Sequence, residues 1–370
     1  MTTLAGERHL VYGRKGRFAG WPANYGMWAW GDEIVVVFAE GAFRPDVEGH
    51  KLDRAQPVST FQARSRDGGE SWAVQPVPCR IPGNRSLSAD EHQSPELRIL
   101  RADGGRNPPL PFAGDVDFTE PELAIMCART GLEAGATSWF YLSTDRAKSW
   151  DGPYEFPGFK VPGVAARTDW LALGPKEAIF LLTAAKADGR EGRVFCAHTA
   201  DGARSFRLQG WVGPEPAGYS IMPSTVRLDD GALLTAVRCH GGKASAHPWG
   251  SIDLYRSGDR GASWRLDGTV VERTGAWGNP PAMLRLRDGR LLLVWGQRDR
   301  PSSIRCAVSR DGGASWSDEM LVSGGGGDED VGYPRVVQRR DSKLVCAYYW
   351  NDAPDRERVI EATVFDPGGI

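Results

Sequence analysis

The stretch S-R-D-G-G-E-S-W, from Ser65 to Trp72, returns almost unchanged as S-R-D-G-G-A-S-W from Ser309 to Trp316. Looser copies start at residues 143, 199 and 257. Each copy follows a short run of alternating apolar residues, which is typical of a strand. Aspartate caps backbone N–H groups and glycine accepts a positive φ, so each copy predicts a tight turn between two strands. Self-similarity of this kind indicates a fold built from repeated units.

A second set of repeats gives the number of units. Strongly apolar, strand-sized runs occur six times, at residues 32–38, 122–128, 177–184, 231–237, 289–295 and 342–349. One of the turns follows each of the first five runs, and the sixth run is followed by the end of the chain. We therefore predict an all-β, six-bladed β-propeller that occupies residues 1–370 as one domain. The N- and C-terminal strands are expected to close the last blade.

Composition excludes several classes of function. The chain has 370 residues, 25% of them charged, and a net charge of −2, so nothing indicates nucleic-acid binding. The apolar runs are too short to cross a membrane as helices. Six cysteines lack C-x-x-C spacing, and no metal site is expected. Reduced cysteines and the absence of a signal sequence predict a cytoplasmic protein, with a secreted protein that has lost its signal as the alternative.

The propeller model predicts which residues face the central channel. Innermost strands are expected to begin near Trp21, Pro121, Asp169, Met222, Pro280 and Tyr333. The loops that follow the second strands carry Glu40, Arg129, Lys186, Arg238, Arg298 and Asp352. Arg17 and Arg167 approach the same face from the first-strand side. Several guanidinium groups at one register predict a site for an anion, above all a carboxylate.

The repeated turns and the six blades resemble the sialidase (neuraminidase) superfamily, in which such turns are called Asp boxes. The resemblance covers nearly the whole chain as architecture. It implies a glycoside hydrolase that needs no cofactor and removes a terminal acidic sugar from a glycan with retention. It also implies a tyrosine nucleophile, a glutamate that activates it, an aspartate acid/base and three arginines for the substrate carboxylate.

Three positions match the catalytic residues of that family. Tyr333, in D-V-G-Y-P-R, resembles the nucleophile, and Asp53, in the loop that also carries His50, resembles the acid/base. The family's activating glutamate has no counterpart near Met222. Its substitute is predicted from four carboxylates, of which Glu120 is preferred: Glu120, Glu122, Asp169 and Asp330.

The expected carboxylate ligands are also only partly matched. Arg238 resembles the second family arginine, and Arg298 or Arg300 the third. Arg17 is the nearest cation to the position of the first, where this chain has Gly20. We predict further substrate contacts from four residues in the funnel: His50, Arg129, Arg167 and Asp169.

Two other functions fit the same sequence. A uronate-directed glycosidase or polysaccharide lyase would use an arginine-lined funnel, with Tyr333 and His50 as proton-transfer groups. A non-catalytic glycan-binding propeller would need no activating glutamate. The glycine- and acid-rich stretch from Ser323 to Asp330 is predicted to be a flexible, solvated loop rather than a lid or a calcium site.

Overall fold

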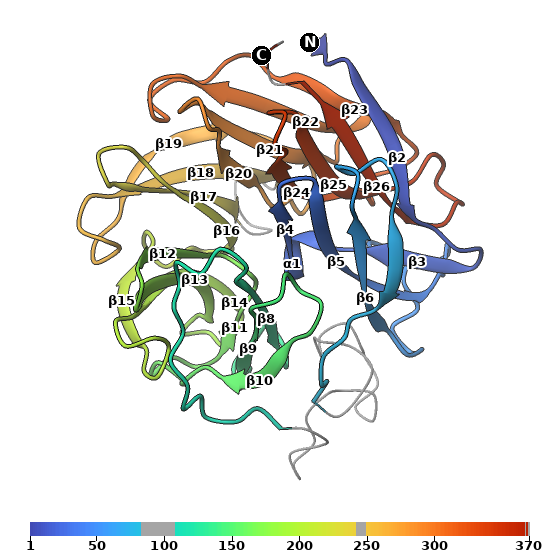
Figure 1. Cartoon of the computed structure of the whole chain (residues 1–370). Coiled ribbons are helices and arrows are strands. Elements are labelled where there is room, and N and C mark those ends of the chain that lie inside the picture. The colour runs from blue at the N-terminus through green and yellow to red at the C-terminus, as the bar shows by residue number, and fades with distance from the viewer. Residues whose placement is uncertain (83–107, 242–248, 367, 369–370) are drawn as a thin grey trace.

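The computed structural model describes residues 1–82, 108–241, 249–366 and 368. Its strands form six sheets arranged as blades around a common axis, which confirms the six-bladed β-propeller (Figure 1). A short helix, α1 (Pro22–Tyr25), lies at the centre of the ring. Among the described residues, no helix is long and apolar enough to cross a membrane.

The first three blades are formed in chain order. The first contains β3 (Arg17–Gly20), β4 (Gly26–Trp30), β5 (Glu33–Ala42), β6 (Ser59–Ser65) and β7 (Ala73–Pro76). The second contains β8 (Ala124–Arg129), β9 (Ser138–Ser143) and β10 (Asp151–Glu155). The third contains β11 (Val164–Ala165), β12 (Trp170–Gly174), β13 (Glu177–Ala185), β14 (Glu191–Thr199) and β15 (Arg207–Trp211).

The other three blades have four main strands each. The fourth contains β16 (Tyr219–Arg227), β17 (Leu233–His240), β18 (Gly250–Ser257) and β19 (Arg265–Val271). The fifth contains β20 (Ala282–Arg285), β21 (Leu291–Gln297), β22 (Ser302–Ser309), β23 (Met320–Gly326) and the two-residue β1 (Thr2–Thr3). The sixth contains β24 (Gly332–Gln338), β25 (Leu344–Trp350), β26 (Val359–Phe365) and β2 (Gly6–Tyr12).

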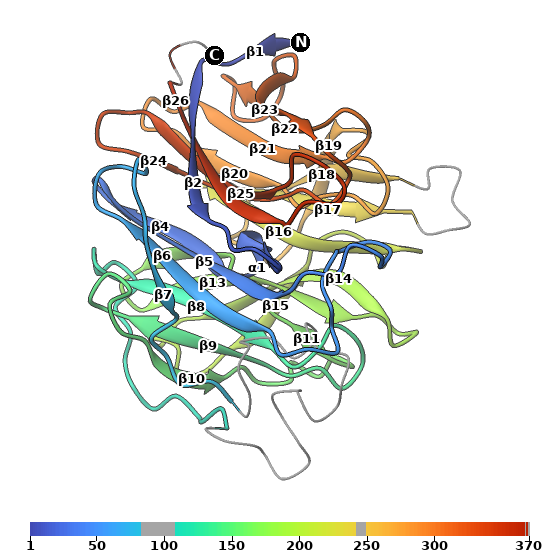
Figure 2. The same cartoon turned by 90° about the vertical axis from the view of Figure 1, so that its right-hand side faces the viewer.

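Both ends of the chain contribute to the sixth blade. β2 pairs antiparallel with β26, with Gly6 opposite Phe365. Figure 2 shows β2 running along this blade, close to the C-terminus. β1 continues into the neighbouring fifth blade, where it pairs parallel to β23. The N-terminal segment therefore pairs with two blades at the point where the ring closes.

Five of the six apolar runs form strands with a partner on each side, as predicted for second strands, and these strands are buried on both faces. In the second blade the run forms β8, which is equally buried but is the edge strand of the described sheet β10-β9-β8. One predicted strand start is wrong. Pro121 and Glu122 lie in a turn, and β8 begins after them at Ala124. The end of β8 that reaches the cavity described below is the opposite one, at Arg129.

The repeated turns share one pattern of hydrogen bonds. In the first, Asp67 Oδ1 accepts N–H bonds from Glu70 at 3.1 Å and Ser71 at 3.0 Å. Ser65 Oγ accepts the N–H of Gly69 at 2.7 Å, and the Trp72 indole donates to the Gly69 carbonyl. The aspartates of the other four turns, Asp145, Asp201, Asp259 and Asp311, accept the equivalent serine N–H. These residues hold the turns and line no part of the central cavity described next.

Candidate active site

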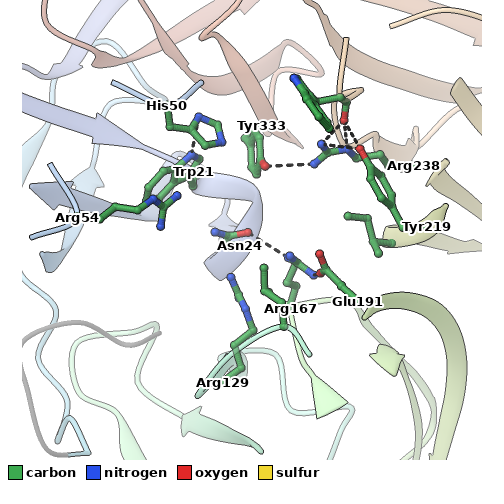
Figure 3. Close-up of a pocket in the computed structure, with 13 residues that line it drawn as sticks. Trp21, Asn24, His50, Arg54, Arg129, Arg167, Glu191, Tyr219, Arg238 and Tyr333 are labelled. Atoms are coloured by element: carbon green, nitrogen blue, oxygen red, sulfur yellow. Dashed lines mark hydrogen bonds and ion pairs between the residues drawn. The ribbon is translucent and has the colours of Figure 1, made fainter. Parts of the chain in front are cut away.

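A cavity of about 280 Å³ lies where the blades meet around α1 (Figure 3). It is lined by Trp21, Asn24, His50, Arg54, Arg129, Leu132, Arg167, Glu191, Tyr219, Ile221, Arg238, Trp277 and Tyr333. Four of these side chains are arginines and one is a carboxylate. The excess of positive charge suits an anionic ligand.

Three cavity or near-cavity residues share an unusual backbone conformation. Trp21, Met222 and Tyr333 each precede a proline and have φ values of 63°, 52° and 51°. Residues other than glycine rarely adopt this left-handed backbone conformation, and the strain costs on the order of 1–3 kcal/mol per residue. At Met222 and Tyr333 the pairing register slips by one residue, which is a β-bulge. A bulge re-aims a side chain, and here it turns Tyr333 into the cavity.

Tyr333 is surrounded by positive charge. Its hydroxyl oxygen accepts a hydrogen bond from Arg238 Nη1 at 3.1 Å. The guanidinium carbons of Arg238 and Arg298 lie 5.8 and 5.7 Å from its ring centre. Burial by itself raises the pKa of the phenol, but the charges of Arg238, Arg298 and Arg167 outweigh burial and hold the pKa of Tyr333 below its ordinary value. Tyr333 can therefore ionise more readily than a free tyrosine.

Arg238 and Arg298 are fixed by neighbours. Arg238, on β17, donates through Nε to the Trp277 carbonyl at 3.1 Å and through Nη2 to the Tyr219 hydroxyl at 3.4 Å. Arg298 is buried behind Tyr333 and donates to the Tyr349 hydroxyl at 3.0 Å. Arg300, the other predicted choice, is exposed. Arg298 is therefore the arginine that contacts the tyrosine.

The opposite wall carries Arg129 and Arg167, which Figure 3 shows directed toward the middle of the cavity. Arg167 Nη1 lies 2.8 Å from Glu191 Oε1, and its Nε donates to Asn24 Oδ1 at 3.3 Å. Glu191 is the one carboxylate that lines the cavity among the described residues. Glu191 was not among the predicted site residues. It begins β14, and Lys186, in the same hairpin, was predicted to lie on the funnel face. The position of Lys186 could therefore have indicated that of Glu191.

Lys186, in contrast, is buried, and it is tied to Asp188 at 3.2 Å.

His50 belongs to a second polar cluster at the cavity edge. Its Nδ1 lies 2.7 Å from Asp330 Oδ1, and Asp330 also accepts hydrogen bonds from Tyr349 at 2.8 Å and Arg358 at 3.0 Å. Burial lowers the pKa of His50, and Arg298 and Arg54 add to this effect against the opposing charge of Asp330. The lowered pKa favours the neutral imidazole, and because the Asp330 carboxylate can only accept, we assign the ring proton to Nδ1.

The predicted flexible loop before Tyr333 is ordered by ion pairs. Asp328 and Asp330 are buried and both contact Arg358, at 2.5 and 3.0 Å. Burial alone raises the pKa of Asp330, but His50 and Arg358 outweigh it and hold that pKa well below its usual range. The expectation of a solvated segment is thus wrong for these two aspartates, which brace the loop beneath His50.

Besides Arg298, which is buried behind Tyr333, four predicted site residues lie outside the cavity lining. Arg17 forms two 2.6 Å bonds to Glu40 within the first blade. Asp53 accepts the Ala55 N–H at 3.0 Å and lies 3.8 Å from Arg44. These contacts hold Arg17 within its blade and Asp53 within its loop, so neither side chain lines the cavity.

The other two are Glu120 and Asp169. Glu120 is exposed and precedes the start of β8, whereas Arg129 at the end of that six-residue strand lines the cavity. Such a strand is roughly 17 Å long, so Glu120 cannot reach the tyrosine hydroxyl. Asp169 is buried and bonded to Thr225 Oγ1 at 2.7 Å, and burial raises its pKa to about 6.

Metal binding finds no support in the part of the chain that the structure describes, where no three His, Cys, Asp or Glu side chains are grouped to hold an ion.

Known proteins share this architecture. No family model and no curated protein matches the sequence. A protein of unknown function from Dyadobacter fermentans superposes with a TM-score of 0.71 and 19% identity, over 97% of this chain and 98% of that one. A Trypanosoma rangeli sialidase mutant with trans-sialidase activity gives 0.62 and 12%, over 98% of this chain and 60% of that one. An α-L-arabinofuranosidase from Fusarium graminearum gives 0.56 and 12%, over 95% and 97%. The fold is therefore one that glycoside hydrolases use.

Proposed function

We propose that the protein is a retaining exo-glycosidase that removes a terminal acidic sugar, such as a sialic or related keto-sugar acid, from a glycan. The observation that carries this proposal is Tyr333, whose hydroxyl is bonded to Arg238 in a cavity lined by four arginines. The fold shared with sialidases and an arabinofuranosidase supports a glycosidase.

The chemistry of an acidic sugar explains this combination. A carboxylate next to the reacting carbon would repel an anionic nucleophile such as aspartate, whereas a phenol carries its charge only as the reaction proceeds. Arg129, Arg167 and Arg238 reach the cavity from three blades and are proposed to bind the carboxylate. Tyr333 attacks the anomeric carbon, and water later releases the sugar with its original configuration.

Product release from a panel of aryl glycosides tests the proposal. The panel covers sialic acid, keto-sugar acids, uronic acids and neutral sugars. Wild type should release an acidic sugar, and Tyr333→Phe should lose that activity. Tyr12→Phe is the matched control, because the Tyr12 hydroxyl bonds Glu40 at 3.2 Å outside the cavity lining. Release of neutral sugars alone would discard the acidic substrate.

A polysaccharide lyase acting on uronates is the second candidate, favoured by one observation. The His50 and Tyr333 rings lie 5.8 Å apart and both line the cavity, so a base and an acid could share one substrate. A lyase forms an unsaturated product that absorbs ultraviolet light, whereas a hydrolase consumes water and forms none. Absorbance during digestion of uronate polysaccharides separates the two reactions.

A further inference from the structure

We infer that Tyr333, His50 and Asp330 act as a proton relay, with His50 rather than Asp53 transferring the proton. This inference rests on the proposed glycosidase function and names the group that completes it. His50 lies in the β5–β6 loop of the first blade, Asp330 in the loop before β24, and Tyr333 on β24 itself. The fold therefore brings together segments that are about 280 positions apart in the sequence. Lys51, the neighbour of His50, is 279 positions from Asp330 and donates its backbone N–H to it.

The geometry resembles that of nucleophile, base and orienting carboxylate in other covalent catalysts. Asp330 accepts from His50 Nδ1 at 2.7 Å, which leaves Nε2 as the unprotonated nitrogen. Figure 3 shows the His50 ring beside Tyr333, with Trp21 on its other side. The edge-to-face contact, with ring centres 5.8 Å apart, holds the imidazole at the nucleophile's side of the cavity.

The hydrogen bonds of Tyr333 leave its proton for the relay. Arginine can only donate, so the phenol oxygen is the acceptor of the 3.1 Å bond from Arg238. The phenol O–H must therefore donate elsewhere. A neutral imidazole in the same cavity is a suitable acceptor, and the Asp330 carboxylate stabilises the imidazolium that forms.

Asp330 is a positioning residue, held in place by three further groups. Its oxygens accept hydrogen bonds from Tyr349, Arg358 and the Lys51 backbone N–H, at 2.8, 3.0 and 2.9 Å. A carboxylate fixed on this many donors keeps His50 in one tautomer and one orientation. Asp53 has no comparable link to the cavity, since it caps Ala55 within its own loop.

The relay balances in both halves of the reaction. First, the Tyr333 oxygen bonds to the anomeric carbon as the bond to the leaving oxygen breaks. The phenol proton passes to His50 Nε2 and from there to the leaving oxygen. Next, water attacks the anomeric carbon and the bond to Tyr333 breaks. One water proton passes through His50 Nε2 to the departing phenolate, and the enzyme returns to its starting state.

Leaving-group dependence tests the relay. Two substrates carry the same acidic sugar, one with a 4-nitrophenyl group that needs no proton to leave and one with an alkyl group that does. His50→Gln should lower kcat/KM for the alkyl substrate by about 10²- to 10⁴-fold and affect the nitrophenyl substrate less. Tyr333→Phe should lose both activities. His198→Gln is the matched control, because His198 pairs with Glu177 at 2.8 Å outside the cavity lining.

A pH profile separates the relay from a structural role. Asp330, Arg298, Arg54, Tyr333 and Tyr349 are the titratable or charged groups that face His50. One limb of the plot of kcat/KM against pH should report the ionisation of His50. His50→Gln should remove this limb, and Asp330→Asn should shift it. Its folding is checked by thermal melting, and if it fails to fold, the His50→Gln profile still decides.

The outcomes are distinct. Equal loss on both substrates in His50→Gln, or no loss, would overturn the relay while leaving the glycosidase in place. Leaving-group dependence in Asp53→Asn instead of His50→Gln would overturn it as well. No release from either substrate by wild type would overturn the proposed function, and the relay with it.

Discussion

Replacing Arg358 by methionine should destabilise the protein severely. Arg358 has no exposed side-chain surface, and its guanidinium contacts Asp328 at 2.5 Å and Asp330 at 3.0 Å. Both carboxylates are almost fully buried, and the arginine also donates to the Arg356 carbonyl at 2.6 Å. The substitution keeps an unbranched side chain but removes the guanidinium, so two buried carboxylates lose the arginine that neutralises them.

The magnitude follows from the burial. Removing one partner of a buried ion pair costs about 3–5 kcal/mol, because the remaining charge stays desolvated. Because two buried carboxylates lose their arginine, the loss of stability in Arg358→Met should lie near the upper end of that range. The total stability of a typical protein is about 5–15 kcal/mol. Added Asp328→Asn should restore part of the loss, since it removes one of the stranded charges.

Urea unfolding followed by tryptophan fluorescence measures this cost. The matched control is Arg265→Met, because Arg265 is 68% exposed and pairs with Asp267 at 2.6 Å. An exposed pair of that kind contributes about 0.2–1 kcal/mol. If Arg358→Met cost no more than Arg265→Met, the buried cluster would not brace the loop before Tyr333 and the reasoning would be refuted.

Three further substitutions test other parts of the account. Gly332→Ala places a Cβ 2.2 Å from Asn279 Nδ2 at a φ of +109°; because Asn279 Oδ1 holds the Tyr333 N–H at 2.9 Å, we expect lower kcat and a lower melting temperature. Glu361→Gln should remove a pH dependence of stability: burial raises the pKa of Glu361 to about 7, so the folded state binds its proton more tightly and wild type should lose stability as pH rises from about 4.5 through 7 in urea titrations. Arg167→Ala should raise the Kd for the free acidic sugar by about 10- to 100-fold in calorimetry, since a charged hydrogen bond contributes about 1.5–3 kcal/mol and Glu191 would be left to repel the ligand.

Each of these expectations has a contrary result. Wild-type kcat in Gly332→Ala would mean that the backbone beside Tyr333 tolerates displacement. A stability profile of Glu361→Gln parallel to wild type would assign the pH dependence to another group. Unchanged affinity in Arg167→Ala, with binding of a neutral sugar as the control, would remove Arg167 from the carboxylate site.

The fold was predictable because its signal is local and repeated. Each Asp-containing turn encodes its own hydrogen bonds, and each second strand is apolar throughout because it is buried on both faces. Tyr333 and Arg238 could be placed in the funnel for the same reason, since their strands have defined registers. Glu120 was misplaced because an apolar run fixes a strand but not which end of it faces the site.

The partners of the site residues depend on packing between blades, which the sequence does not reveal. Nothing in the chain near His50 indicates Asp330, whose acidic, glycine-rich surroundings favoured a solvated loop. The burial of Arg358 reverses that expectation. Arg17 likewise had the right residue type, but its strand pairs with β5 so that Glu40 neutralises it.

Peptide mass spectrometry after reaction with a fluorinated acidic-sugar fluoride tests the central claim most directly. The fluorine next to the reacting carbon slows release of the sugar and traps a covalent intermediate. We predict one sugar per chain, attached to the peptide that contains Tyr333, and no adduct in Tyr333→Phe. An adduct on another residue, or hydrolysis of the reagent without any adduct on Tyr333 at any time point, would contradict the assignment of Tyr333 as the nucleophile.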